Sequence, residues 1–265
     1  MAMGTEWETG AVATTVPLPA PVEPARQGGL APGACRVKLT VVIPVYNERE
    51  TIQEALRRVR ALGEDPAGDV DLEIVVVDDC SGDGSREILA REPGIVLLRH
   101  PENRGKGASI RTALAHASGE IVAVQDADLE YDPRDLLRLI EPIRRGEAKV
   151  VYGSRFLRGR PKMQLPNYIC NRLLALTANV LYGARLTDEA TCYKVFEADL
   201  VRSIPLTCRR FEFCPEVTAK VLKRGERILE FPITYDPRTY DSGKKIRWQD
   251  GVVALWTLLK YRFVK

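Results

Sequence analysis

Residues 119–133 read Gly-Glu-Ile-Val-Ala-Val-Gln-Asp-Ala-Asp-Leu-Glu-Tyr-Asp-Pro. The apolar run 121–124 is typical of a buried strand and leads directly into Asp126 and Asp128. Residues two apart on a strand point to the same side, so the two carboxylates are predicted to lie together. Such a pair suits a hard divalent cation that takes its other ligands from water and substrate phosphates. Aspartate is also common in turns, so the pair alone is equally consistent with a solvated loop.

Two other apolar runs end in polar residues in the same way. The run 72–77 is followed by Asp78 and Asp79, and the run 39–45 is followed by Tyr46, Asn47 and Glu48. Parallel strands bring their carboxyl ends to one edge of a sheet, where α/β proteins bind their ligands. The sequence therefore predicts a parallel sheet with a site at that edge.

Short apolar runs alternate with helical patterns between residue 38 and about residue 155, which predicts a right-handed α/β sheet. Strands are predicted near 39–45, 72–78, 95–99, 121–125, 149–153, 193–196 and 227–234. Helices are predicted near 51–62, 85–91, 106–117, 134–145, 167–181, 215–224 and 248–263. The helix at 106–117 follows Gly105, and its first backbone N–H groups are expected to be available to a phosphate.

Composition limits the class of protein. The chain has 265 residues, 45% of them apolar, and a net charge of +3, which is too small to indicate a nucleic-acid partner. Its six cysteines and two histidines lack zinc-site spacing and suit a reducing cytosol. Residues 1–36, rich in Ala, Pro, Gly and Thr, predict a disordered tail. Residues 37–265 are predicted to be a single domain, with a donor half at about 37–155 and an acceptor half at about 156–265.

No signal peptide is predicted, and the apolar run 252–259 is far shorter than the roughly 20 residues that span a bilayer. The segments 169–181 and 248–263 have one apolar side and basic neighbours. They are predicted either to pack in the core or to lie on a membrane surface, which would make the protein cytoplasmic and peripheral on the cytoplasmic membrane face.

Four motifs in order resemble the signatures of family-two inverting glycosyltransferases, and most of all the polyprenyl-phosphate (dolichyl-phosphate) sugar synthases. The motifs are residues 41–48 (Val-Val-Ile-Pro-Val-Tyr-Asn-Glu), 75–85 (Val-Val-Val-Asp-Asp-Cys-Ser-Gly-Asp-Gly-Ser), 103–107 (Asn-Arg-Gly-Lys-Gly) and 126–128 (Asp-Ala-Asp). The resemblance implies a GT-A-like sheet, mostly parallel, with helices on both faces and C-terminal elements on the acceptor side. It also implies a nucleotide-diphosphate sugar as donor, Mg²⁺ or Mn²⁺ as cofactor, and a lipid phosphate as acceptor.

The same resemblance assigns roles to residues of this chain. Donor binding falls to Pro44, Tyr46, Glu48, Asp78, Asp79, Lys106, Asp126 and Arg155, and metal binding to Asp126, Asp128 and Glu130. Catalysis falls to Asp128, Asp188, Glu216, Arg238 and Lys244. The plain alternatives are solvated side chains for Lys106 and Arg155, a loop carboxylate for Glu130 and a helix cap for Asp188.

The acceptor decides which catalytic groups are needed. A sugar hydroxyl needs a general base, for which Glu216 is the candidate. A phosphate monoester, with a second pKa of about 6, is already anionic and needs cations to guide it. The loop 235–245 supplies Arg238 and Lys244, with Lys245 as a substitute for Lys244, unless it is merely a solvated basic loop.

Other functions are considered on the same residues. A dinucleotide fold is rejected because the glycine run after strand 72–77 lacks its third glycine and carries acidic residues, and a P-loop motif is missing. A transferase acting on a soluble hydroxyl, a sugar nucleotidyltransferase and a sugar-nucleotide binder without activity remain as alternatives to the lipid-phosphate enzyme.

Overall fold

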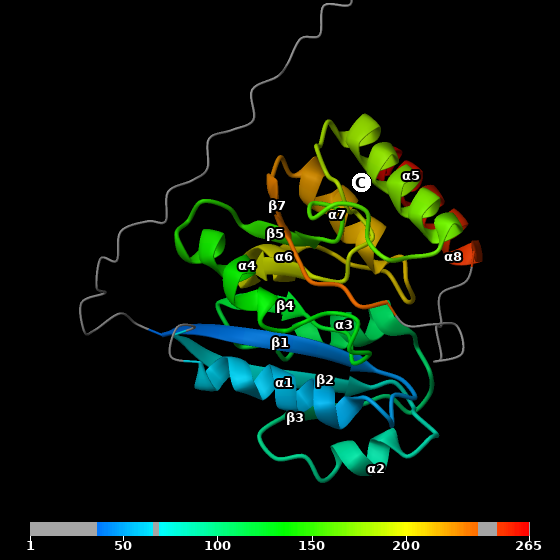
Figure 1. The fold of residues 1–265 in the computed structure, drawn as a ribbon. Helices are drawn as coiled ribbons and strands as arrows, with labels where there is room; N and C mark the ends of the chain where they lie inside the picture. The colour runs from blue at the N-terminus through cyan, green and yellow to red at the C-terminus, as the bar shows by residue number, and fades with distance from the viewer. Residues whose placement is uncertain (1–35, 66–68, 238–247, 265) are drawn as a thin grey trace, which may run out of the picture. The chain divides into compact units, whose positions relative to one another are not determined.

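The computed structural model describes residues 36–65, 69–237 and 248–264. In these residues a seven-stranded sheet has the order β3-β2-β1-β4-β6-β5-β7 (Figure 1). The strands are β1 (Val37–Val45), β2 (Val70–Asp78), β3 (Val96–Arg99), β4 (Ile121–Val124), β5 (Val150–Ser154), β6 (Lys194–Glu197) and β7 (Ile228–Pro232). The helices are α1 (Ile52–Glu64), α2 (Ser85–Leu89), α3 (Lys106–Leu114), α4 (Asp135–Arg144), α5 (Leu165–Tyr182), α6 (Ala198–Ser203), α7 (Phe213–Lys223) and α8 (Trp248–Phe263).

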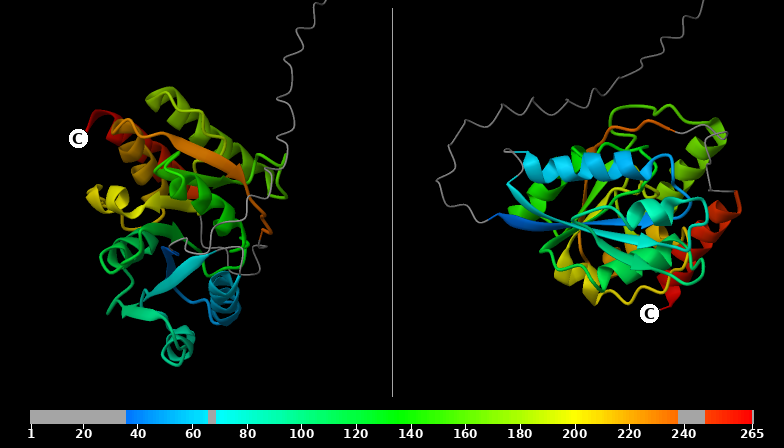
Figure 2. Two further views of the ribbon diagram at one scale, coloured as in Figure 1. Left: turned by 90° about the vertical axis from the view of Figure 1, so that its left-hand side faces the viewer. Right: turned by 90° about the horizontal axis from the view of Figure 1, so that it is seen from below.

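The first half of the sheet is parallel, as the alternating sequence pattern predicts. β1 pairs in parallel with β2 and β4, and β2 pairs in parallel with β3. Helices lie on both faces of the sheet, so the central strands are buried on both sides and their sequences are almost continuously apolar (Figure 2). The predicted mostly parallel α/β fold is confirmed.

Strand β6 breaks the parallel order. It lies between β4 and β5 and runs antiparallel to both, whereas β5 pairs in parallel with β7. Because β6 is antiparallel, its first residue, Lys194, lies beside Tyr152 near the carboxyl end of β5. The segment 186–193, which enters β6, is therefore delivered to the edge where β4 and β5 end. The sequence pattern predicts the strand but not its direction.

The prediction that the first backbone N–H groups of α3 are available to a phosphate is wrong. The backbone N–H groups of Gly107 and Ala108 donate hydrogen bonds to the carbonyl oxygens of Arg210 and Arg209, each at 3.0 Å. The free N–H groups at the start of a helix need acceptors, and here the carbonyl groups of the neighbouring loop 209–210 provide them. A periodic sequence gives no sign of such a distant partner.

Helices α5 and α8 pack on each other and on α7 around a second apolar cluster that includes Leu174, Ala178 and Leu258. Their outer sides remain apolar and exposed. The exposed side chains, called the α5–α8 face below, are Leu165, Ile169, Leu173, Leu176 and Val180 on α5 and Val252, Val253, Trp256, Leu259 and Phe263 on α8. No helix in the described ranges combines the length and apolarity needed to cross a membrane.

Candidate active site

The loops that follow β1 and β2 are joined by hydrogen bonds. The backbone N–H of Asn47 donates to Ser81 Oγ at 3.0 Å, and the N–H of Gly82 donates to Asn47 Oδ1 at 2.9 Å. The N–H of Glu48 donates to Ser85 Oγ at 2.9 Å. These contacts bring the first two motifs together at the carboxyl edge of the sheet.

Backbone strain is concentrated at the same edge. Non-glycine residues with positive φ include Asn47 (51°), Cys80 (62°) and Leu129 (64°), and they follow the ends of β1, β2 and β4. A left-handed leucine is unusual and persists only where its surroundings fix it, as they often do at functional sites. Leu129 directly follows Asp128, so the turn out of the Asp-x-Asp motif is held in a defined conformation.

Asp78 holds the β2 loop from inside. Its carboxylate is fully buried and accepts the N–H of Ser81 at 3.0 Å and Arg86 Nε at 2.8 Å. The structure thus gives Asp78, a predicted donor-binding residue, a partner within the protein for each oxygen.

Asp79 has a similar position between two loops. Its Oδ1 lies 2.6 Å from Nδ1 of the buried His100 and accepts the N–H of Arg104 at 2.9 Å, and its Oδ2 accepts the N–H of Gly105 at 2.7 Å. The other ring nitrogen of His100 lies 3.0 Å from Thr112 Oγ1. Asp79 therefore fixes the loop that carries Lys106, and His100 is a buried partner of Asp79 that sequence motifs do not reveal.

Lys106 reaches the Asp-x-Asp motif. Its ammonium lies 2.6 Å from Oδ1 and 2.7 Å from Oδ2 of Asp126. Burial lowers the pKa of Lys106, but the negative charge of Asp126 more than reverses this and leaves the pKa well above its usual range. The lysine is therefore charged at neutral pH, and its alternative as a solvated side chain is wrong.

Asp126 and Asp128, separated by Ala127, follow the end of β4, and both side chains are half-buried. Asp128 Oδ1 accepts the N–H of Glu130 at 3.1 Å, so the loop turns around this carboxylate. No group of three or more His, Cys, Asp or Glu side chains is arranged to hold a metal in the described residues, so a third protein ligand from Glu130 is not assembled there. Mg²⁺ and Mn²⁺ usually bind proteins through one or two carboxylates, and the pair Asp126 and Asp128 fits such an ion.

The Asp-x-Asp loop is attached to the start of the basic loop 235–245. The N–H of Asp236 donates to the carbonyl oxygen of Glu130 at 2.9 Å, and Tyr131 forms an isolated antiparallel bridge with Tyr235. The first residues of the basic loop are thus adjacent to the loop that carries Asp126 and Asp128, and Arg238 and Lys244 lie outside the described residues.

Arg155 and Asp188, both predicted site residues, bind each other. Arg155 Nε and Nη2 donate to the two oxygens of Asp188 at 2.7 Å each, and its backbone N–H adds a third bond at 3.0 Å. Both side chains are buried. Such a bidentate pair is strong and fixes the geometry of both groups. The alternatives of a solvated arginine and a helix cap are both wrong.

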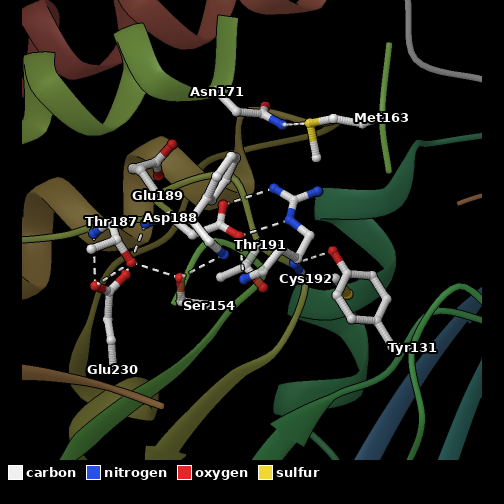
Figure 3. A network of polar contacts seen from close by, with 12 residues as sticks. Tyr131, Ser154, Met163, Asn171, Thr187, Asp188, Glu189, Thr191, Cys192 and Glu230 are labelled. Carbon is white, nitrogen blue, oxygen red and sulfur yellow. Dashed lines mark hydrogen bonds and ion pairs between the residues drawn. The ribbon is translucent and has the colours of Figure 1, made fainter. Parts of the chain in front are cut away.

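The segment around Asp188 is anchored by Glu230 of β7. Glu230 accepts the backbone N–H groups of Thr187 at 2.7 Å and Asp188 at 2.9 Å, and Ser154 Oγ lies 2.6 Å from Thr187 Oγ1 (Figure 3). Sequence reasoning missed Glu230, because a lone glutamate in a strand carries no motif.

The carboxylate oxygens of Glu216, the candidate base, accept hydrogen bonds from several groups of the protein. It accepts the N–H groups of Thr207 at 2.8 Å and Cys208 at 2.6 Å, the Tyr261 hydroxyl at 3.0 Å, and the ammonium of Lys220. Burial raises the pKa of Glu216, but the hydrogen bonds from Lys220 and Thr207 outweigh it and leave the pKa lowered. A buried carboxylate of low basicity that holds three segments together is poorly suited to remove a proton from a substrate.

Glu189, which follows Asp188, has an unusual environment for a carboxylate. Glu189 is fully buried, and neither of its carboxyl oxygens has a hydrogen-bond partner among the described residues. Burial raises the pKa of Glu189, and the charge of Lys194 lowers it only in part. Burial therefore disfavours the charged form of Glu189.

The remaining predicted donor residues lie at the end of β1. Pro44 and Glu48 are half-buried, and Tyr46 is exposed. A cavity of about 270 Å³ lies near the 103–107 motif and is lined by Glu102, Asn103, Arg104, Arg209 and Arg210. Three of its five lining residues are cationic, which favours an anionic ligand.

Comparison with known proteins agrees with this architecture. The glycosyl transferase family 2 model matches residues 40–204. The chain is 33% identical to the low-salt glycan biosynthesis hexosyltransferase Agl6 of Haloferax volcanii over 76% of this chain and 48% of that protein. It is 30% identical to the undecaprenyl-phosphate mannosyltransferase of Micrococcus luteus over 85% of this chain and 99% of that protein.

Two further comparisons have lower identity. The dolichol-phosphate mannosyltransferase of Pyrococcus furiosus is 26% identical over 78% of this chain and 59% of its own length. The crystal structure of glucosyl-3-phosphoglycerate synthase from Mycobacterium tuberculosis superposes with a TM-score of 0.65 at 21% identity, over 86% of this chain and 80% of that one. The match to that structure concerns the fold. The family model covers most of the described sheet and every motif at its carboxyl edge up to Asp188, and the chain belongs to glycosyl transferase family 2.

Proposed function

We propose that this glycosyltransferase moves a hexose from a nucleotide-diphosphate sugar to a polyprenyl phosphate, with inversion at the anomeric carbon. The observation that carries the proposal is the junction at the end of β4, where Asp126, Asp128 and the ammonium of Lys106 lie beside the start of the basic loop 235–245. This junction has carboxylates for a metal, and the sequence of the loop that starts beside it contains the cations Arg238 and Lys244 for the phosphates.

The same groups suit a divalent metal cofactor and a nucleotide-sugar donor. Asp126 and Asp128 would hold Mg²⁺ or Mn²⁺, which supplies positive charge to offset the charge of a departing nucleoside diphosphate. The glucosyl-3-phosphoglycerate synthase with the similar fold was crystallised with Mn²⁺ and UDP, which supports a divalent ion and a nucleotide-sugar donor here.

The transfer itself needs a nucleophile and room for in-line attack. An oxygen of the acceptor phosphate forms a bond to C1 of the sugar while the bond from C1 to the donor diphosphate breaks and its electron pair leaves with the diphosphate. Attack from the opposite side inverts C1. The phosphate is already anionic, so the protein must hold and orient it, for which Arg238 and Lys244 are proposed.

The state of Glu216 favours this acceptor over a soluble hydroxyl. A hydroxyl would need a base, and Glu216 is engaged by Thr207, Cys208 and Lys220. The named activities of the Micrococcus and Pyrococcus relatives, both transferases to polyprenyl phosphates, also support a lipid phosphate.

The α5–α8 face supports a peripheral position on a membrane. Val180 is 74% exposed and Trp256 is 64% exposed, and the basic residues Arg172, Lys260 and Arg262 lie on the same two helices. Apolar side chains bordered by cations suit the interface of an anionic bilayer, and we place this enzyme on the cytoplasmic face.

Product analysis tests the proposal. The full chain is incubated with Mn²⁺, radiolabelled UDP- or GDP-hexoses, and either a polyprenyl phosphate or the matching polyprenol. We expect label in the organic phase with the phosphate alone, together with release of a nucleoside diphosphate. Transfer to a soluble glycan, or release of pyrophosphate, would contradict it.

A further inference from the structure

The ammonium of Lys106 covers the carboxylate of Asp126. It lies within 2.7 Å of both oxygens, and the two side chains are only 21% and 18% exposed. A carboxylate presents the same two oxygens to a divalent ion. An ammonium and a divalent cation also repel each other at this separation, so the two cannot occupy the carboxylate together at low cost.

The lysine is held at this place by its backbone. Gly105 has φ of 92°, and a Cβ there would lie 2.4 Å from the carbonyl oxygen of Arg209. Asp79 accepts the N–H of Gly105, and Arg210 accepts the N–H of Gly107. The residues on both sides of Lys106 are thus fixed, which distinguishes it from a surface lysine that meets a carboxylate by chance.

We propose that Lys106 is a built-in counter-cation that excludes a divalent ion from Asp126 until the donor diphosphate arrives. The diphosphate offers the ammonium a second anionic partner and gives the ion further oxygen ligands. Metal and donor then bind cooperatively, and by linkage each raises the affinity of the other equally. The inference rests on the proposed metal site at Asp126 and Asp128 and adds the order in which it fills.

The test measures Mn²⁺ binding, not activity. Free Mn²⁺ is followed by electron paramagnetic resonance while the full-length protein is titrated without nucleotide, and then with UDP or GDP. Lys106→Met should bind Mn²⁺ alone about tenfold or more tightly than wild type, because the competing charge is gone. Lys106→Arg, which keeps the charge, should stay weak. The control Lys149→Met removes a lysine that pairs with Glu226 at 3.2 Å away from the site and should change nothing.

Nucleoside diphosphate provides the second readout. In wild type it should raise Mn²⁺ affinity strongly, and in Lys106→Met the increase should be smaller. Thermal unfolding checks that each variant is folded, and Lys106→Gln serves as a second neutral variant.

The possible results distinguish failure of the counter-cation role from failure of the metal site. If wild type binds Mn²⁺ with nucleoside diphosphate but Lys106→Met and Lys106→Gln gain no affinity for Mn²⁺ alone, the counter-cation role is overturned and the metal site stands. Tight binding by Lys106→Arg would also overturn it. If wild type binds no Mn²⁺ even with nucleoside diphosphate, the metal site itself fails and the inference fails with it.

Discussion

At the scale of single residues, buried carboxylates in this enzyme differ in how their charge is compensated. Asp188 has a bidentate arginine, and Glu216 has a lysine and several N–H donors. The two carboxyl oxygens of Glu189 accept no hydrogen bond in the described part of the chain. An unpaired buried charge is costly, so burial raises the pKa of Glu189, whereas the hydrogen bonds from Lys220 and Thr207 leave the pKa of Glu216 lowered.

Asp128→Asn should lower turnover by about 10²–10³-fold, the usual size for loss of one group that stabilises charge in the transition state. It should also weaken Mn²⁺-dependent donor binding in calorimetry. The fold should survive, because an asparagine Oδ1 can still accept the N–H of Glu130. Full activity of the variant in saturating EDTA would exclude the metal role.

Glu189→Gln should stabilise the protein at neutral pH. Burial raises the pKa of Glu189 in the folded chain, so the folded state binds this proton more tightly than the unfolded state. The wild type therefore loses stability as the pH rises from about 4, the unfolded pKa, toward the folded pKa. Glutamine has the shape of the neutral acid and escapes this loss.

Thermal unfolding at a series of pH values measures this effect. The midpoint of Glu189→Gln should equal that of wild type near pH 4 and exceed it by a few degrees near pH 7, since about 1 kcal/mol shifts the midpoint by roughly 2–4 °C for a domain of this size. A variant that is less stable than wild type at neutral pH would mean that Glu189 is ionised and paired.

The sequence could locate these residues but could not assign their partners. Strand ends and motif spacing placed Asp126 and Asp128 at the sheet edge, because that information is local. The partners of Asp188 and Glu216 come from Arg155, 33 residues away, and from Tyr261, 45 residues away. Periodicity contains nothing about such pairs, so the sequence assigns both residues a catalytic role and gives no sign of the partners that bind them in the fold.

At the scale of elements, α5 and α8 have two apolar sides each. One side forms the cluster with α7, and the other is the exposed α5–α8 face. The sequence left two interpretations open for these helices, a core role and a surface role, and the structure shows that each helix has a buried side as well as an exposed one. The antiparallel insertion of β6 and the short helix α6 were not predictable, since neither has a periodic signal of its own.

Replacing Leu176 and Val180 together by Glu should abolish binding to anionic vesicles. Each apolar side chain contributes up to about 1.5–3 kcal/mol when buried, so their loss should weaken binding at least tenfold. Flotation at low and high salt measures it. The control is Val96→Glu on β3, which places the same charge at an apolar residue that is 40% exposed elsewhere.

Binding of wild type should also weaken with salt, because cations on α5 and α8 contribute. If wild type fails to float with anionic vesicles at low salt, or if the double variant floats as well as wild type, the α5–α8 face is not the membrane-binding surface. A soluble acceptor would then be favoured.

At the scale of the whole molecule, the sheet brings two kinds of groups to one edge. Its parallel half supplies the carboxylates and Lys106, and its mixed half supplies Arg155, Asp188 and the start of the basic loop beside Glu130. Asp188 and Glu216, the two acids predicted to be catalytic on the acceptor side, are held in ion pairs and hydrogen bonds. We therefore assign guidance of the acceptor to cations, with no general base.

Single-turnover transfer to polyprenyl phosphate, with donor saturating, tests this claim most directly. The variants are Arg238→Ala and Glu216→Gln, each shown to be folded at the assay temperature. Arg238→Ala should lose about 10²-fold or more in rate, and folded Glu216→Gln should stay within about tenfold of wild type, because loss of a true base costs about 10²–10⁴-fold. An inactive Glu216→Gln beside a nearly normal Arg238→Ala would contradict the account.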